Sequence, residues 1–446
     1  MTLRGARRRL GQRLLSPFSR LTTRGRAVLS AGATAIVCAV ALGQRDLLRV
    51  GALLALVPVL SALVLSRARY RLACSRTVTP VRVEVGKPAQ VVLEIANVSS
   101  TRCGMVLAEE QVPYTLGSRP RFVLPGLEPG ERRAISYPVR SDVRGRFAVG
   151  PLSLTLTDPF GMGEHRRSFS ARDDLIVIPP VVALPPVALG GDWSGSGDTR
   201  PRAVAASGED DVTTREYRQG DDLRRVHWRS TARRGELMVR REEQPWQSRA
   251  TLVLDRRRAA HRGDGQASSF EWAVSAVASL AVHLAGRGYA IRLCDGSPGQ
   301  DAHVAWAHAE GQSFTGLAEA SSSLVLDALA SASLGGAVEL QRAVHAANRS
   351  ATGGLVIAVV GELTPDDTTM LAGLHQLGTT CIALIADTTG AISDPTVHER
   401  VRDGVRSQAE QLRAAGWDVL EVREGEGLDA TWRRVGTGRL LAGGTR

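Results

Sequence analysis

One histidine with acidic neighbours is the group in this sequence that is best suited to acid–base chemistry. His227 follows Asp221 and Asp222 and lies close to Arg224 and Arg225. A carboxylate can orient an imidazole as a general base, and a guanidinium can hold an anionic substrate. No nucleophile or second catalytic group accompanies them. An enzyme that uses His227 with Asp221 or Asp222 is therefore the alternative hypothesis, and we assign no catalytic residue.

These residues belong to a charged block that runs from Gly208 to Trp246. Between Glu209 and Glu243 it carries nine arginines and nine acids, so the block is neutral. Nucleic-acid surfaces gain affinity by replacing counterions with unopposed cations, and a neutral block argues against that partner. Interleaved arginines and carboxylates instead favour a docking surface, or a structured junction that packs against its own domains.

The rest of the composition excludes several common chemistries. Lys87 is the only lysine, so a Walker-type nucleotide loop cannot exist. The five cysteines are scattered without a C-x-x-C pair, which is typical of a reducing compartment and not of a disulfide framework or zinc site. The G-x-S-x-G, H-E-x-x-H and G-x-G-x-x-G motifs are also missing. We expect no cofactor.

The basic excess of the chain lies at its N-terminus. The net charge is +11, but residues 1–71 carry thirteen arginines against the single acid Asp46, and the remainder has a net charge of −1. Residues 1–26 form a basic head that we expect on the cytoplasmic side of a membrane.

Residues 27–66 contain two apolar runs, from Ala27 to Gly43 and from Leu47 to Leu65. As helices they reach roughly 26 to 28 Å, near the lower limit for crossing a bilayer. The short turn between them predicts a transmembrane hairpin, and Ala31, Ala35 and Ala39 give the first helix a small-residue face. Arginines flank both outer ends, so we expect both termini and the later domains in the cytoplasm.

The next region, residues 72–182, has the pattern of short strands. Runs such as VRVEV, AQVVLEIANV, RAISYPV, FAVGPLSLTL and LIVIPP are separated by Gly, Pro and Asn. This pattern predicts an antiparallel β-sandwich of immunoglobulin-like kind without the antibody Cys and Trp landmarks. Residues 183–207 are rich in Gly, Pro, Ser and Ala and are interpreted as a linker.

Residues 247–446 alternate between continuous apolar runs and helical patterns. The runs TLVLD, YAIRLCD, GLVIAVVG, TCIALIAD and WDVLEV predict a mostly parallel sheet covered on both faces by helices. Ligands of such sheets bind beyond the carboxyl ends of the strands. That edge should carry the residues that end these runs, which are Asp255, Asp295, Gly361, Glu362 and Asp387.

The sequence REYRQGDDLRRVHWRSTARRGELMVRREE, at residues 215–243, resembles the signature of the bacterial family called domain of unknown function 58. RGRFAVGPLSLTLTDPFG at residues 144–161 and the two N-terminal spans support this resemblance. It implies a von Willebrand factor A-like, Rossmann-like α/β domain at 247–446, after a signature segment at 208–246. It also implies a link to MoxR-type AAA+ ATPases, beside which such proteins are often encoded.

The resemblance also points to the residues of the signature as a binding or structural set. They are Arg215, Glu216, Tyr217, Gly220, Asp221, Asp222, Arg224, Arg225, His227, Trp228, Arg233 and Gly235. Von Willebrand factor A domains bind a metal through D-x-S-x-S after the first strand. Here the aspartate of this motif is present as Asp255, but Arg257 and Ala259 stand in place of the two serines whose hydroxyls bind the metal. Because arginine repels a divalent ion, we predict no metal at this degenerate position.

Together these observations predict a multidomain membrane protein of two spans. The leading hypothesis is that the protein is a membrane-anchored cytoplasmic scaffold. It would contact the lipid bilayer, bind a MoxR-type AAA+ ATPase and act in envelope assembly. We expect no nucleic-acid partner.

Overall fold

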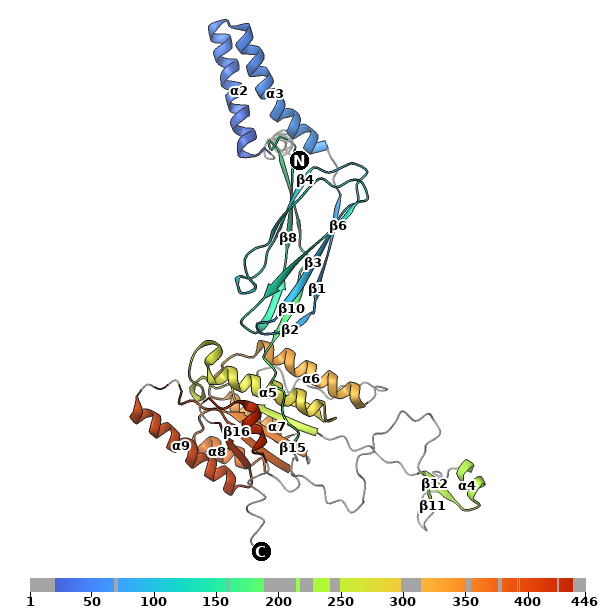
Figure 1. The fold of residues 1–446 in the computed structure, drawn as a ribbon, viewed down its shortest axis with the longest axis vertical. Coiled ribbons are helices and arrows are strands. Elements are labelled where there is room, and N and C mark those ends of the chain that lie inside the picture. Colours follow the sequence, from blue (N-terminus) through green and yellow to red (C-terminus); the bar gives the residue numbers. More distant parts are fainter. Residues whose placement is uncertain are drawn as a thin grey trace, which may run out of the picture. The chain divides into compact units, whose positions relative to one another are not determined.

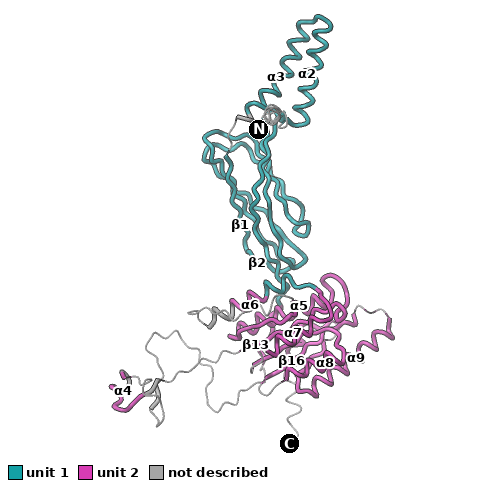
Figure 2. The backbone as a smooth tube through the Cα atoms, turned by 180° about the vertical axis from the view of Figure 1, so that it is seen from behind, with its two compact units in different colours: residues 1–181, 326–333 teal, residues 182–325, 334–446 magenta. Residues whose placement is uncertain are grey.

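The computed structural model of the chain describes residues 21–67, 71–158, 160–187, 214–216, 228–240, 249–297, 314–349, 354–375, 379–390, 392, 394–422 and 425–435. The chain divides into two compact units (Figures 1 and 2). Unit 1 comprises residues 1–181 with 326–333, and unit 2 comprises residues 182–325 with 334–446.

Unit 1 begins with the two predicted apolar helices, α2 (Thr23–Leu42) and α3 (Arg45–Arg67). Both are long and apolar enough to cross a membrane. Helix α2 starts before the apolar run because Thr22 caps it, its side-chain oxygen accepting a hydrogen bond from the backbone N–H of Gly25 at 3.1 Å. It ends at Gly43, whose φ of 62° is the left-handed conformation that glycine adopts without strain.

The packing face of the hairpin differs from the one predicted. Ala39 is buried and Ala35 is half-buried, but Ala31 is exposed, and the helices approach closely at Gly32 in α2 and Gly51 in α3. A Cβ added at Gly32 would lie 2.7 Å from the backbone nitrogen of Ala55 in α3. Residues four apart drift by about 40° around a helix, whereas residues seven apart drift by only about 20°, so the seven-residue series Gly25, Gly32 and Ala39 stays on one face.

Ten strands follow in unit 1 and form three sheets. The sheet orders are β1-β3-β6, β2-β10-β7 and β5-β4-β8-β9, and every pairing is antiparallel except the parallel pair β2 and β10. The strands are β1 (Leu72–Thr79), β2 (Arg82–Glu84), β3 (Pro88–Asn97), β4 (Met105–Glu110), β5 (Arg121–Leu124), β6 (Arg132–Arg140), β7 (Gly145–Val149), β8 (Leu152–Thr157), β9 (Glu164–Phe169) and β10 (Asp173–Ile178).

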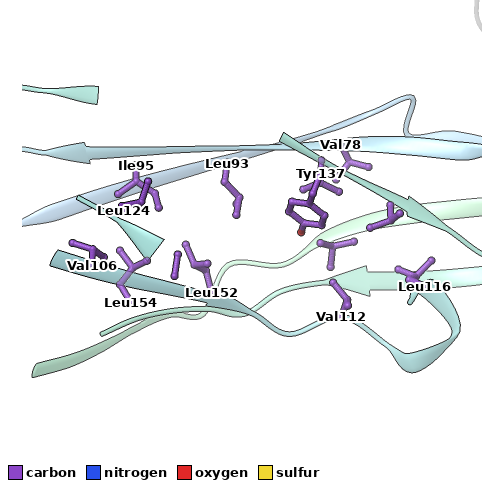
Figure 3. Close-up of a cluster of buried hydrophobic side chains, with 14 of the residues drawn as sticks. Val78, Leu93, Ile95, Val106, Val112, Leu116, Leu124, Tyr137, Leu152 and Leu154 are labelled. Carbon is purple, nitrogen blue, oxygen red and sulfur yellow. The ribbon is translucent and has the colours of Figure 1, made fainter. Parts of the chain in front are cut away.

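These sheets share one hydrophobic core. In β3 every second side chain, from Ala89 to Ile95, is fully buried, as expected for a strand with one face in the core. Figure 3 shows Leu93 of β3, Tyr137 of β6 and Leu154 of β8 within the same cluster. The sequence FAVGPLSLTL, which we treated as one run, is two strands in different sheets, because Gly150 (φ 107°) and Pro151 interrupt it.

A buried ion pair lies inside unit 1. The Nε of Arg76 in β1 donates to an Oε of Glu110 in β4 at 2.6 Å, and its Nη1 donates to Asp173 at 2.8 Å. The side chain of Glu110 is fully buried and also accepts a hydrogen bond from the hydroxyl of Tyr137. Burial and this carboxylate raise the pKa of Tyr137, so the hydroxyl stays protonated and remains a donor.

The main sheet of unit 2 contains the five predicted strands and is entirely parallel, in the order β14-β13-β15-β16-β17. Their bounds are β13 (Arg249–Leu254), β14 (Ala290–Cys294), β15 (Gly354–Val360), β16 (Thr379–Ile385) and β17 (Asp418–Glu421). Nearly every residue of β13, β15 and β16 is buried, which is characteristic of a parallel sheet covered on both faces.

Helices cover both faces of this sheet (Figure 1). One hydrophobic cluster joins α7, α8 and α9 to the side of the sheet that includes Val253, while the neighbouring Leu252 and Leu254 point to the opposite face, where α5 packs. The helices are α5 (Ser269–Ala285), α6 (Phe314–Ser331), α7 (Glu339–Asn348), α8 (Pro365–Ala372), α9 (Pro395–Ala414) and α10 (Leu428–Arg433).

Replacing Arg76 by Met should strongly destabilise unit 1. The change leaves Glu110 buried without its cation, and breaking a buried ion pair in this way costs about 3–5 kcal/mol. The matched control is Arg121→Met, which removes the partner of Glu109 from an exposed pair and should change the melting temperature little. Calorimetric melting of the full chain in detergent measures both. Equal shifts for the two variants would contradict the interpretation.

Candidate functional site at the carboxyl edge of the parallel sheet

The strand order of unit 2 creates a point at which the chain reverses direction across the sheet. Strand β13 lies between β14 and β15, so the connections that leave β13 and β14 lead to opposite sides of the first strand. In doubly wound sheets of this order, ligands bind at the carboxyl ends of the strands beside that switch point. Asp255 and Arg257 follow β13 there, and Gly361 and Glu362 follow β15.

A buried guanidinium occupies the centre of this edge. Arg257 donates to Asp255 from Nε to Oδ1 at 3.0 Å and from Nη2 to Oδ2 at 2.8 Å. Its Nη1 donates to Oδ2 of Asp367 at 2.6 Å, and Nη2 also reaches the carbonyl oxygen of Glu362 at 3.2 Å. Burial disfavours the charge of Arg257, but the hydrogen bonds and charges of Asp255 and Asp367 outweigh it and raise its pKa. Arg257 therefore joins the two carboxylates as an internal cation.

Asp367 links this ion pair to helix α8. Its Oδ2 accepts hydrogen bonds from the backbone N–H and hydroxyl of Thr364, at 2.8 and 2.7 Å. The first of these, together with the bond from the backbone N–H of Asp367 to the hydroxyl of Thr364 at 3.3 Å, forms the capping box of α8. Burial opposes ionisation of Asp367, but the bonds from Thr364 and the charge of Arg257 lower its pKa. The carboxylate thus caps a helix and neutralises a buried arginine.

The degenerate metal position is Asp255, and its two oxygens are engaged by Arg257. Oδ1 also accepts the backbone N–H of Arg257 at 3.0 Å. A divalent cation needs several free oxygen ligands, and here the nearest side chain carries a positive charge. The residues present do not fit a metal ion. The absence of a metal stays a prediction, and this geometry supplies the physical reason for it.

A histidine that the sequence analysis passed over lies beneath Asp255. His261 is buried, with Nε2 at 2.8 Å from the carbonyl oxygen of Asp255 and Nδ1 at 3.1 Å from Oγ of Ser269. Because a carbonyl only accepts, Nε2 carries the proton. Burial lowers the pKa of His261, so the ring is neutral at physiological pH. It holds the loop after β13 against α5.

The other acids predicted at this edge are also bonded within the unit. Asp295 accepts from Arg256 at 3.1 Å, and Glu362 accepts from Arg262 at 3.0 Å. Asp387 accepts the backbone N–H of Thr389 at 2.8 Å. At Gly361 an added Cβ would lie 1.9 Å from the carbonyl oxygen of Ala260, so only glycine allows the loops after β13 and β15 to meet.

A pocket of about 500 Å³ opens beside the edge. It lies between the start of α5, where Ser268 and Trp272 line it, and the loops after β16 and β17. Its volume is within the range of small-molecule sites. Three charged residues line it. Arg262 is bonded to Glu362 and Glu426 to Arg434, while Asp387 accepts hydrogen bonds from the backbone N–H and the hydroxyl of Thr389. The pocket therefore combines an aromatic wall with charged groups that already have partners within unit 2.

The described ranges contain no group of three or more His, Cys, Asp or Glu residues arranged to hold a metal ion. Cys294, at the end of β14, is buried, and burial raises its pKa to about 11, which keeps it a thiol and a poor nucleophile. The chemistry of this edge is thus that of charge neutralisation and loop positioning.

Only part of the signature set lies within the described residues. Arg215 and Glu216 are in strand β11 (Thr214–Glu216), and Trp228 and Arg233 are in helix α4 (Trp228–Arg234). Gly235 follows the helix with a φ of 76°. Seven others lie outside the described residues, namely Tyr217, Gly220, Asp221, Asp222, Arg224, Arg225 and His227. The hypothesis of catalysis by His227 stays untested.

The described part of the signature forms a small β-helix-β element. Strand β12 (Met238–Arg240) pairs antiparallel with β11. The hydroxyl of Thr231 in α4 accepts the backbone N–H of Met238 at 3.0 Å, and Met238 is buried. Trp228 is 68% exposed, and Leu237 is 40% exposed. The element therefore has an anchored interior and places an indole ring in solvent.

The described residues define a class of protein with two apolar N-terminal helices, a domain of mainly antiparallel sheets and a parallel, doubly wound α/β domain. Residues 213–300 match the model of the family described as "Protein of unknown function DUF58". This match supports the family assignment that the signature predicts.

Comparisons with other proteins add little. A search of curated proteins found no match. The CARDB domain of the PF1109 protein from Pyrococcus furiosus is 15% identical, covering 24% of this chain and 89% of that domain, with a TM-score of 0.20. A fragment of alpha-2-macroglobulin from Escherichia coli is 15% identical, covering 25% of this chain and 17% of that one, with a TM-score of 0.21. TM-scores of this size carry no inference about this chain.

Replacing Arg257 by Met should destabilise unit 2. The change leaves Asp255 and Asp367 without their shared cation, and we expect a loss of about 3–5 kcal/mol. Arg258→Met is the matched control, since this neighbouring side chain is exposed and its loss should stay within about 0.5 kcal/mol. Thermal melting of the full chain in detergent compares them. A wild-type melting temperature for the Arg257 variant would refute the role of the ion pair.

His261 should make the stability of unit 2 depend on pH. Its folded pKa lies below the ordinary value of about 6.5, so the unfolded chain takes up the proton first. The free energy of unfolding should therefore fall as the pH drops from about 6.5 towards the lowered folded value. We expect His261→Gln to reduce this dependence, with the remainder coming from His283, whose pKa burial also lowers. Denaturant melts between neutral and mildly acidic pH measure the slope, and an unaltered slope in His261→Gln would count against this assignment.

Proposed function

We propose that the chain is a membrane-anchored protein that binds other proteins through its cytoplasmic domains. The two apolar helices support the anchor by their length and composition. Arginines flank the outer ends of the hairpin, with Arg24 and Arg26 before the first apolar run and Arg67 and Arg71 after the second. By the positive-inside rule, this pattern supports a cytoplasmic location for both termini and both large domains.

We interpret the two large domains in terms of known folds. Residues 72–182 share one core between several sheets, which supports an immunoglobulin-like β-sandwich. The parallel sheet of unit 2, with Asp255 at the end of its first strand, supports a von Willebrand factor A-like domain whose metal position is held by Arg257. The hydroxyl of Ser269 lies 3.1 Å from Nδ1 of His261, but both residues are buried and hold a loop in place, so this geometry supports binding over catalysis.

The exposed Trp228 is the observation that carries the binding proposal. A tryptophan that is 68% exposed leaves a large apolar surface in water, and Leu237 adds to the exposed apolar surface of the same element. Arg233 and Arg234 of α4 are exposed as well. Tryptophan and arginine are the residue types most enriched at the energetic centres of protein interfaces. This combination fits a partner that has an apolar pocket with an acidic rim.

The partner we propose is a MoxR-type AAA+ ATPase, with a role in envelope assembly. This assignment rests on the family resemblance, since such ATPases are often encoded beside the family. An ATPase that remodels or is recruited by a membrane scaffold needs an exposed contact on the cytoplasmic side, and the signature segment offers one.

Replacing Trp228 by Ala should weaken capture of the ATPase by the chain without unfolding it. Removing an anchor residue at the centre of an interface typically costs about 2 kcal/mol or more, a loss of roughly thirtyfold in affinity. The measurement is a pull-down of the purified ATPase by the detergent-solubilised full chain, with and without ATP. Tyr114→Ala, which truncates a 92% exposed aromatic of unit 1, is the control and should bind normally.

Two results would reject the proposal. If the wild-type chain fails to retain the ATPase in either nucleotide state, the ATPase is not its partner. If Trp228→Ala binds normally, the signature segment is not the contact. Thermal melts of each variant separate lost binding from unfolding, because the exposed indole ring contributes little to the folded state.

A further inference from the structure

A tight turn at the end of strand β8 is ordered by its own hydrogen bonds. The backbone N–H of Gly161 donates to the carbonyl oxygen of Asp158 at 3.0 Å, and the N–H of Gly163 donates to its Oδ1 at 2.6 Å. Gly161 has a φ of 67°, which glycine adopts without strain. The conformation of the turn is thus fixed by its own residues.

This turn is bonded to the first turn of helix α2. The backbone N–H of Thr22 donates to the carbonyl oxygen of Met162 at 2.9 Å, and its hydroxyl donates to that of Gly161 at 2.7 Å. Leu21 forms a bridge with Gly163 and is 2% exposed. A Cβ added at Gly25 would lie 2.2 Å from the oxygen of Met162, so only glycine permits the contact. The turn is therefore held directly against the start of α2.

The contact with the start of α2 indicates how deep the turn lies relative to a bilayer. The exposed Arg24 and Arg26 lie in the first turn of α2, and the apolar run begins at Ala27. Arginine side chains at the end of a spanning helix lie among the lipid headgroups. Because the turn contacts Thr22 and Gly25, it lies at the same level as these arginines.

The turn places a phenylalanine in solvent at that level. Phe160 is 68% exposed, a large apolar surface for a residue of a tight turn. Aromatic and aliphatic side chains at the boundary between headgroups and acyl chains stabilise the attachment of a protein to a membrane surface. On the basis of the proposed membrane anchor, we infer that Phe160 inserts into the lipid interface beside α2. Residues 160–163 of the turn are then a second membrane contact of the β domain.

The strand register provides a matched control residue at the other end of the same sheet. Strands β4 and β8 pair from Met105 opposite Thr157 to Glu110 opposite Leu152. Phe160 follows the Thr157 end, whereas Tyr114 follows the Glu110 end and is 92% exposed. Six paired residues span roughly 17 Å, so Tyr114 lies at the opposite end of these strands from Phe160.

The test uses a polarity-sensitive fluorophore attached to single cysteines of the full chain. Phe160→Cys and Tyr114→Cys are each made with Cys38→Ala, labelled with a nitrobenzoxadiazole maleimide, and reconstituted into phosphatidylcholine and phosphatidylglycerol vesicles. The remaining thiols react poorly, because Cys103, Cys294 and Cys381 are buried and burial raises the pKa of Cys74 to about 11. The unaltered chain, labelled at the exposed Cys38 of α2, reports whether the hairpin is in lipid.

We expect the label at position 160 to show blue-shifted emission that is lost when the vesicles contain lipid with a spin label near its headgroup. The label at position 114 should emit as in water and resist this quenching. If Cys38 reports lipid while position 160 reports water, the inference fails and the anchor stands. If Cys38 itself reports water, the anchor fails and the inference with it. Both substituted side chains are exposed, so the variants should melt as the wild type does.

Discussion

The structure depends on the rule that a charge removed from water must find an opposite charge and hydrogen bonds. Arg257 meets this requirement with Asp255 and Asp367, and Arg76 meets it with Glu110. In each case one guanidinium bonds two carboxylates that lie far from each other in the sequence. A planar fork of five donors can do this, whereas an ammonium group offers a single point of charge. In a chain whose only lysine is Lys87, these two buried cations are arginines, as is the buried Arg256.

The parts of the fold that follow from local pattern could be predicted from the sequence. Continuous apolar runs mark β13, β15 and β16 because both faces of a parallel sheet are buried, and the two apolar helices follow from length and composition. The strand pattern of β1 is weaker, because the buried side chain of Arg76 stands where alternation would place an apolar residue. The exception arises because Glu110, in another strand, satisfies that arginine.

The candidate site shows where sequence reasoning stops. Asp255 and the unusual Arg257 could be recognised from their place after the first strand. Their partner Asp367 could not, because it follows 110 residues after Arg257 and meets it only when two loops converge at the sheet edge. His261 gave no motif, and its role depends on burial. The exposure of Trp228 is likewise decided by tertiary packing, since the sequence alone allows a buried or an exposed indole ring.

The hydrogen bonds between Thr22 and the turn at 161–163 have a mechanical consequence. A domain joined to a helical hairpin by one stretch of backbone, here the residues after α3, is free to swivel about that tether. The second attachment, at the start of α2, prevents this rotation and holds the β domain in one orientation around the hairpin axis. A sideways load on the domain is then divided between two points and reaches α2 as a torque.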